Sequence, residues 1–156
     1  MKEIEELKRQ LAEIQTKIEE LEKKTQFERV EKGEDYFAID YTKQGLTVLK
    51  WKECNDECDD GGYNNNNYFH TEERAEEVAK SVSVLLKLWR LHDTLCEDYK
   101  PNWKDEEPKW FVFYSYQGEK WCKGWWTRSN YNLPYFPTEE LAQKACDILN
   151  EEGFKP

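Results

Sequence analysis

The sequence predicts an α+β protein in which an N-terminal coiled-coil helix precedes tandem β-hairpin/α-helix repeats packed as one domain. Three observations lead to this prediction. A strict apolar heptad opens the chain, a segment of eight residues recurs 67 positions later, and aromatic, strand-like runs precede both copies of that segment. The corresponding boundaries are residues 1–26 for the leader, 27–102 for the first repeat, which is acidic, and 103–156 for the second repeat.

The leader places Ile or Leu at the first and fourth positions of three successive heptads, with polar residues between them except for Ala12. Such a narrow stripe is typical of a coiled-coil seam, because a helix packed on a globular core needs a wider apolar face. The alternative is a helix folded back on its own domain. We predict a homodimer through this seam, which consists of Ile4, Leu7, Leu11, Ile14, Ile18 and Leu21.

The residues beside the seam leave the orientation of the two helices open. In a parallel pair, Glu3 would lie near Lys8 and Lys17 near Glu22, and both combinations are favourable. In an antiparallel pair, Glu3 would lie near Lys24, which is also compatible.

Each repeat is expected to form a hairpin, a loop and a helix. Residues 36–39 (YFAI) correspond to residues 110–113 (WFVF), and each run reaches a turn, at Gly45 or Gly118, before a second aromatic strand. Residues 110–114 are apolar on both faces, which predicts a central strand covered by a helix on one side.

The two helices are predicted to begin at matching positions. Residues 68–75 (YFHTEERA) return as residues 135–142 (YFPTEELA), with Thr71 and Thr138 as N-caps followed by glutamates that favour a helix N-terminus. The first helix should bury Ala75, Val78, Ala79, Val82, Leu85, Leu86, Trp89 and His92. The second should bury Ala142, Ala145, Cys146 and Leu149, and end at Gly153.

Charge and composition narrow the function classes. The chain has 156 residues and a formal net charge of -10, and residues 27–108 alone carry -9. This balance argues against broad binding to nucleic acid or to an anionic membrane. The sequence has neither a membrane-spanning run nor a signal peptide, and its five cysteines are an odd number, so we expect a soluble cytoplasmic protein with reduced thiols.

The chain resembles a group of uncharacterised proteins from bacteriophages and prophages of gut Firmicutes. The likeness rests on the heptad leader, on residues 33–40 (GEDYFAID), and on an Asn-rich loop leading into residues 68–73 (YFHTEE). Its most specific element is the helix start Phe-x-Thr-x-Glu-x-Ala at residues 69–75, which recurs at residues 136–142. The resemblance implies a phage protein in the cytoplasm of a bacterial host, where small accessory proteins often bind host machinery.

No catalytic or metal-binding motif is complete. Cys54, Cys58 and His70 resemble part of a zinc site, with Cys96 or an aspartate as the fourth ligand, but the usual second close pair is missing. A calcium loop starting at Asp56 would need a glutamate at its twelfth position, where the chain has asparagine. We therefore predict a solvated acidic turn, no metal, no cofactor and no enzymatic activity.

Two groups of residues are candidates for binding a partner. Residues 120–128 (KWCKGWWTR) combine three bases and three tryptophans, as in segments that stack on bases or anchor protein interfaces. The alternative is a core strand, in which Trp125 and Trp126 point to opposite faces and one of them is core. From this segment we selected Lys120, Lys123, Trp125 and Arg128. The acidic candidates are Asp56, Glu57, Asp59, Asp60, Glu73, Glu76 and Glu77.

These features favour a non-enzymatic phage protein that inhibits a host antiviral protein such as a CRISPR nuclease. Its carboxylates would meet the Lys and Arg side chains that normally hold phosphate, and its aromatic residues would supply the desolvated anchor. Two alternatives stay open. One is capture of a small nucleotide in an aromatic pocket with Lys123 or Arg128, and the other is single-stranded nucleic-acid binding through residues 120–128.

Overall fold

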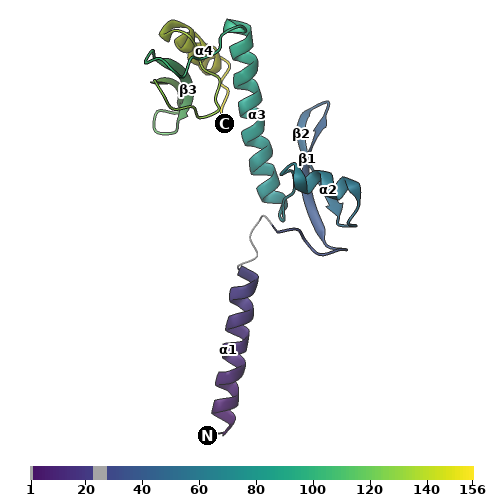
Figure 1. The fold of residues 1–156 in the computed structure, drawn as a ribbon. Coiled ribbons are helices and arrows are strands. Elements are labelled where there is room, and N and C mark those ends of the chain that lie inside the picture. Colours follow the sequence, from purple (N-terminus) through teal and green to yellow (C-terminus); the bar gives the residue numbers. More distant parts are fainter. Residues whose placement is uncertain (1, 23–27) are drawn as a thin grey trace. The chain divides into compact units, whose positions relative to one another are not determined.

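The computed structural model describes residues 2–22 and 28–156, with side chains from residue 4 to 18 and from residue 28 onward. Within these ranges the chain forms helices and two small hairpin sheets, so the predicted α+β class is confirmed (Figure 1). None of the helices in the described ranges combines the length and the apolar character needed to cross a bilayer.

The elements follow one another in the order expected, with one addition. The helix α1 (Lys2–Glu22) comes first, and the strands β1 (Asp35–Thr42) and β2 (Gly45–Lys52) form the first sheet. A short helix, α2 (Glu57–Asn64), then replaces the acidic turn that the sequence suggested. The remaining elements are α3 (Glu72–Cys96), β3 (Lys109–Ser115), β4 (Lys120–Trp126) and α4 (Glu139–Glu151).

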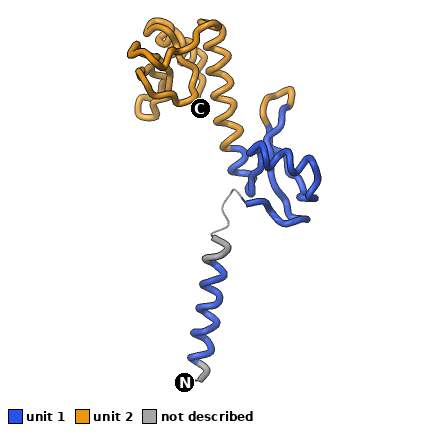
Figure 2. Tube along the Cα trace, viewed as in Figure 1, with its two compact units in different colours: residues 1–41, 47–76 blue, residues 42–46, 77–156 orange. Residues whose placement is uncertain are grey.

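The backbone divides into two compact units, whereas the sequence grouped both hairpin-helix repeats in one packed domain. Unit 1 comprises residues 1–41 and 47–76, and unit 2 comprises residues 42–46 and 77–156 (Figure 2). The helix α3 begins in unit 1 and continues through unit 2, so the boundary falls inside a helix.

The core of unit 1 is small and aromatic. The rings of Tyr36 and Tyr68 stack with their centroids 4.1 Å apart, and both side chains are buried. Ala75, in the first turn of α3, is fully buried. A backbone bridge joins Phe37 to Phe69 through two hydrogen bonds of 2.8 and 2.9 Å, and this bridge fixes the segment before α3 against β1.

The core of unit 2 lies between the β3–β4 hairpin and two helices. Val112 of β3 and Trp121 of β4 pack with Leu88 and Leu91 of α3. From α4 come Ala142, Ala145, Cys146 and Leu149, which the sequence analysis predicted to be buried. The indole N–H of Trp121 donates to the carbonyl of Phe154 at 2.8 Å. The C-terminal segment is thereby bonded to the hairpin.

The prediction for residues 110–114 is correct in the helical cover on one side and wrong in the central position of the strand. Among the described strands β3 pairs with β4 alone, and its other edge has a single bridge from Trp110 to Phe136, so both are edge strands of a two-stranded sheet. Val112 is buried, but its neighbour Phe113 on the other face is 43% exposed. An apolar sequence on both faces of a strand therefore does not require cover on both faces here.

Both predicted helix starts are confirmed by the capping contacts. The Thr138 hydroxyl accepts a hydrogen bond from the Leu141 N–H at 3.3 Å, and the Thr71 hydroxyl accepts one from the Arg74 N–H at the same distance. Each contact satisfies a backbone donor that the first turn of a helix leaves open.

The two halves share the backbone bridge as well as the cap. Trp110 bridges to Phe136 in unit 2, as Phe37 bridges to Phe69 in unit 1. These bridges match Phe37 with Trp110, whereas the sequence comparison matched Phe37 with Phe111. The alignment of the two strands made from the sequence was therefore shifted by one residue. Because successive side chains of a strand point to opposite faces, this shift exchanges the residues matched as inward-facing and outward-facing.

The apolar stripe predicted for α3 is only partly correct. Ala75, Ala79 and His92 are buried, but Leu86 and Trp89 are exposed by 40% or more. The residues buried in the later turns are Leu88 and Leu91, which the prediction omitted. The reason is that α3 serves two units in succession, so no single stripe runs along its whole length.

Candidate functional site

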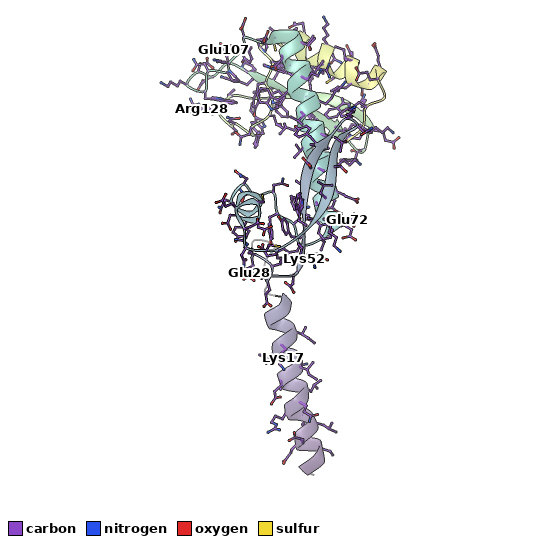
Figure 3. The ribbon with its side chains drawn as sticks, turned by 90° about the vertical axis from the view of Figure 1, so that its right-hand side faces the viewer. Lys17, Glu28, Lys52, Glu72, Glu107 and Arg128 are labelled. Carbon is purple, nitrogen blue, oxygen red and sulfur yellow. The ribbon has the colours of Figure 1, made fainter. Side chains whose placement is uncertain are left out.

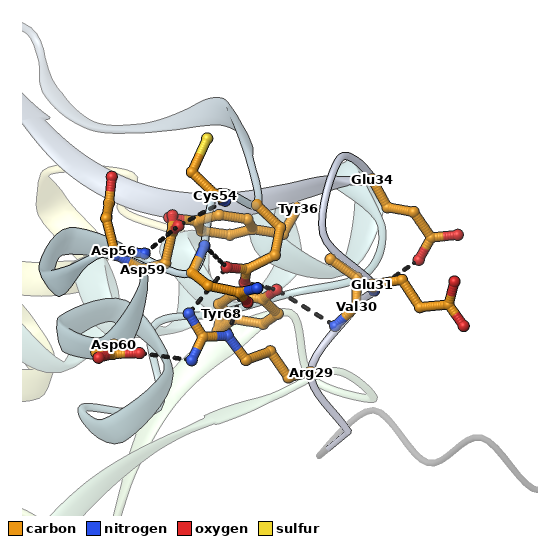
Figure 4. A network of polar contacts seen from close by, with 12 residues as sticks. Arg29, Val30, Glu31, Glu34, Tyr36, Cys54, Asp56, Asp59, Asp60 and Tyr68 are labelled. Atoms are coloured by element: carbon orange, nitrogen blue, oxygen red, sulfur yellow. Dashed lines mark hydrogen bonds and ion pairs between the residues drawn. The ribbon is translucent and has the colours of Figure 1, made fainter.

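A network of buried charges and hydroxyl groups lies around Glu53, directly after β2 (Figure 4). The Arg29 guanidinium donates from Nε and Nη2 to the two Glu53 carboxylate oxygens, at 2.8 Å each. The Tyr68 hydroxyl also donates to Glu53, at 2.7 Å, and so does the Asn55 N–H, at 2.7 Å. Glu53 is fully buried, so it depends on these four donors.

Asp59 is the second buried carboxylate of this network. Its Oδ1 accepts a hydrogen bond from the Tyr36 hydroxyl at 2.8 Å, and its Oδ2 accepts bonds from the backbone N–H groups of Cys54 and Asp56 at 2.7 and 3.2 Å. Burial alone would raise the pKa of Asp59. These donors outweigh burial and lower the pKa to about 2.

The other members of the network have pKa shifts of the same origin. The hydrogen bonds from Arg29 lower the pKa of Glu53. Burial, reinforced by hydrogen bonds to the carboxylates, raises the pKa values of Tyr36 and Tyr68. At neutral pH both carboxylates are therefore ionised and both phenols are protonated.

The network accounts for the helix α2, which the sequence analysis missed. Asp56 caps this helix because its carboxylate accepts hydrogen bonds from the N–H groups of Cys58 and Asp59, at 2.9 and 3.0 Å. The Asp59 carboxylate in turn accepts a hydrogen bond from the Asp56 N–H. This is a capping box. Its signal in the sequence is Asp56 with an acidic residue three positions later, although Gly61 and Gly62 in the second half of the helix are weak helix formers.

The acidic candidates of residues 56–60 therefore have unequal roles. Asp59 is only 3% exposed, so its selection as a partner-binding residue is wrong. Asp56 is occupied as a helix cap, and Asp60 forms an ion pair with Arg29 at 2.5 Å. Glu57 is exposed in the first turn of α2.

The candidates on α3 are all exposed. Glu73 and Glu76 lie in the part of α3 that belongs to unit 1, and Glu77 lies in unit 2. Together with Glu57, the exposed carboxylates Glu73 and Glu76 form what we call the acidic set of unit 1.

The cysteines and histidine considered for zinc do not converge. Cys54 and Cys58 are exposed, and His70 Nε2 contacts the backbone carbonyl of Glu28. Among the residues with described side chains, no three His, Cys, Asp or Glu groups are placed to hold a metal ion.

The second candidate site is on the β3–β4 hairpin in unit 2. The antiparallel register pairs Phe111 with Gly124 and Phe113 with Cys122. Residues directly opposite in a sheet share a face, and alternate residues of one strand also share a face. Because Val112 and Trp121 face the core, the other face carries the set that we call the outer aromatic face: Phe111, Phe113, Cys122, Gly124 and Trp126.

Two side chains of the outer aromatic face are open to solvent. Phe113 is 43% exposed and Trp126 is 45% exposed. Phe111 lies between them in the register, with its ring 6.1 Å from that of Phe113. The Phe111 ring lies over Gly124, where an added Cβ would come within 2.9 Å of the ring. Glycine at this position therefore leaves room for the tip of the Phe111 ring.

The structure places the predicted residues of the 120–128 segment on two sides of the hairpin. Lys120 is exposed on the side of the outer aromatic face, opposite Ser115. Lys123 lies on the inner side, where Nζ donates to Gln143 at 2.5 Å and pairs with Glu139 at 3.4 Å. Arg128 forms an ion pair with Glu106. The segment is therefore not one continuous basic surface.

The prediction that either Trp125 or Trp126 is core is wrong. Both are exposed, and Trp121 is the tryptophan of β4 that packs in the core. Trp125 lies beside Trp110 with ring centroids 6.5 Å apart. Trp126 was not among the selected residues, and Phe113 was missed altogether. Its signal was the alternation of Phe111, Val112 and Phe113, which indicates opposite faces.

The seam residues predicted for oligomerisation lie on α1. Its side chains stand out from the helix in Figure 3, where Lys17 is labelled. Five of the six seam residues are exposed, namely Ile4, Leu7, Leu11, Ile14 and Ile18. The side chain of the sixth, Leu21, lies outside the described residues.

Comparison with known proteins finds no family model, no curated protein and no solved structure that matches this chain. The resemblance to phage proteins stays a prediction from the sequence.

Proposed function

We propose that this protein is a non-enzymatic, phage-encoded binding protein that acts in the cytoplasm of a bacterial host and inhibits an antiviral defence protein such as a CRISPR nuclease. The observation that carries the binding role is the outer aromatic face, on which Phe113 and Trp126 remain exposed. Partly exposed aromatic side chains on one face of a sheet are typical anchors of protein interfaces.

The acidic set of unit 1 supplies the electrostatic part of the proposal. Glu57, Glu73 and Glu76 are exposed, within a stretch of strongly negative net charge. Carboxylates of this kind compete with phosphates for Lys and Arg side chains that line a nucleic-acid channel. In this mechanism the acidic set determines the rate and salt dependence of association, and the aromatic face determines how long the complex lasts.

The buried carboxylates support a binding role over an enzymatic one. Glu53 and Asp59 are two buried carboxylates of one network, and buried carboxyl groups with shifted pKa values can also mark a catalytic site. Each of their oxygens already accepts at least one hydrogen bond within the chain. A general acid or base needs an open position toward a substrate. We therefore assign this pair to the architecture of unit 1.

The direct test is capture of a purified CRISPR nuclease by the immobilised full-length protein, with and without guide RNA. We expect retention that weakens as the salt concentration rises, and that falls at least tenfold in affinity for the double variant Phe113→Ser/Trp126→Ser. The matched control is Tyr41→Ser, which changes an exposed aromatic residue of unit 1. If the purified nuclease is not retained, or if the control and the double variant bind it with the same affinity, the proposal fails.

A separate pair of variants tests the acidic set. Glu73→Gln and Glu76→Gln keep the size of the side chains and remove two charges. We expect a slower association rate and a weaker dependence on salt, with little change in the dissociation rate. An unchanged salt dependence would remove the acidic set from the mechanism.

Single-stranded nucleic-acid binding is the second candidate, and one observation favours it. Lys120 lies on the side of the outer aromatic face and makes no ion pair within the described ranges, so a phosphate could approach it beside stacked bases. The net charge of -10 opposes this function. A gel shift at low salt with single-stranded DNA and RNA, compared with Lys120→Glu, distinguishes it from protein binding.

The nucleotide-pocket alternative has less support. Its two candidate cations, Lys123 and Arg128, already pair with Glu139 and Glu106. A nucleotide phosphate would have to displace these carboxylates. Calorimetry against cyclic nucleotides and ADP-ribose derivatives tests it, and flat titrations would remove it.

A further inference from the structure

The apolar seam of α1 has no part in the proposed binding function. Five of its side chains are between 48% and 60% exposed: Ile4, Leu7, Leu11, Ile14 and Ile18. On the polar side of the same helix, Arg9 pairs with Glu6 at 2.7 Å and with Glu13 at 3.8 Å. The seam is thus the side of α1 that a partner would cover.

We propose that this partner is α1 of a second copy of the chain, in an antiparallel two-stranded coiled coil. Leu7 then lies opposite Ile18 of the partner subunit, and Leu11 lies opposite Ile14 of the partner subunit. The proposal goes beyond the binding function and does not depend on it.

A parallel arrangement is disfavoured by the middle heptad. In a parallel pair each seam residue meets its own copy, so Leu11 meets Leu11 at the first heptad position and Ile14 meets Ile14 at the fourth. Two-stranded parallel coils prefer Ile at the first position and Leu at the fourth, and the reverse order favours higher oligomers. The sequence therefore contains one heptad that works against a parallel dimer.

An antiparallel arrangement removes this conflict. Each layer then joins the first heptad position of one helix to the fourth position of the other. Every layer contains one Ile and one Leu, since the spacing also brings Ile4 to the level of Leu21. No layer holds two Ile or two Leu side chains, so the middle heptad no longer sets Leu11 against Leu11 or Ile14 against Ile14.

The residues beside the seam are compatible with this orientation. The antiparallel register brings Gln10 near Lys17 and Lys8 near Gln15. No like charges meet at these positions, so the flanks do not oppose the pairing that the seam favours.

Disulfide mapping tests the orientation in the full-length protein. Leu7→Cys and Ile18→Cys chains are mixed in equal amounts, oxidised, digested and mapped by mass spectrometry, which separates the new bonds from those of the five native cysteines. We expect a bond between residues 7 and 18 in the mixture. Its yield should fall at least tenfold when Glu13→Cys, on the polar side, replaces Leu7→Cys. Bonds between two copies of residue 7 would show a parallel coil and overturn the proposal.

Sedimentation of the full-length protein tests the assembly without any cysteine. Above the 18.9 kDa monomer, the mass should rise toward the dimer at roughly tens of micromolar, since so short a coil is marginal on its own. Leu11→Asp/Ile18→Asp should remain a monomer. The control Glu5→Asp/Ala12→Asp has the same seven-residue spacing on the polar side and should behave as wild type. A monomer at all concentrations for the wild type overturns the proposal.

Discussion

The side-chain amide of Asn150, in the last turn of α4, bonds both backbone groups of Trp121 in β4. Oδ1 accepts from the Trp121 N–H at 2.8 Å, and Nδ2 donates to the Trp121 carbonyl at 3.2 Å. The Asn150 side chain thus satisfies the backbone N–H and carbonyl of Trp121, as a third strand would do at this edge of β4. The same two bonds hold α4 against the hairpin that carries the outer aromatic face.

Replacing Asn150 with Ala should destabilise unit 2. The change removes two hydrogen bonds to a strand whose free edge has no other strand, and we expect a loss of about 1–2 kcal/mol in the free energy of unfolding. Urea denaturation followed by tryptophan fluorescence measures it. Glu151→Ala, at the exposed next position of α4, is the control and should change the midpoint little. Equal midpoints for the two variants would contradict the role of Asn150.

Removing the hydroxyl of Tyr68 should destabilise unit 1. Tyr68→Phe keeps the ring stacked on Tyr36 but deletes a donor to the buried Glu53 carboxylate, so we expect a cost of about 1–2 kcal/mol. Thermal unfolding of the variant measures the cost. Tyr41→Phe, whose hydroxyl is on an exposed side chain, should unfold as wild type.

The stability of the protein should fall steeply in acid because of Asp59. Its pKa is about 2 in the folded state and about 3.8 ordinarily, so ionised Asp59 stabilises the fold above pH 4. That contribution is lost as the pH falls from about 4 to about 2. Glu53, whose pKa is also lowered, acts in the same direction.

The measurement is the free energy of unfolding at several pH values between 2 and 6. Asp59→Asn should be less stable at pH 6 and should lose less stability toward pH 2 than the wild type. Glu57→Gln, which changes an exposed carboxylate of the same helix, should keep the wild-type profile. Parallel profiles for wild type and Asp59→Asn would show that Asp59 does not contribute.

Gly124 and Phe111 should be energetically coupled. An alanine methyl group at position 124 would force the Phe111 ring to move, because the two would be 2.9 Å apart. In a double-mutant cycle, Gly124→Ala should cost about 1 kcal/mol more with Phe111 present than in the Phe111→Leu background. Additive costs would indicate that the ring moves away freely.

Local signals in the sequence were enough to predict the class and the positions of most elements. The caps at Thr71 and Thr138 and the turn glycines are contacts between near neighbours in the chain, so their pattern is visible in the sequence. The heptad of α1 is a local pattern of the same kind. The alignment of the two hairpins made from the sequence was correct to within one residue. The exact alignment, Phe37 with Trp110, came from the backbone bridges of the structure.

The parts that the sequence did not predict depend on distant residues. Glu53 looks like an ordinary exposed glutamate after a strand, and its burial depends on Arg29, which lies 24 positions earlier. The same holds for α2, where the capping contacts and the buried Asp59 outweigh two glycines in the second half of a short helix. The exposure of Phe113 depends on which distant segments pack on each face of the β3–β4 hairpin, and α3 and α4 pack on the opposite face.

The burial of Cys146 in the core of unit 2 gives the protein an internal chemical reporter. Desolvation raises the pKa of this thiol to about 11, so about one molecule in ten thousand carries the thiolate at pH 7. Cys54 and Cys58, by contrast, are exposed to solvent. An alkylating reagent should therefore label Cys54 and Cys58 first. The slower rate at which Cys146 is labelled would then measure how often the core around α4 opens.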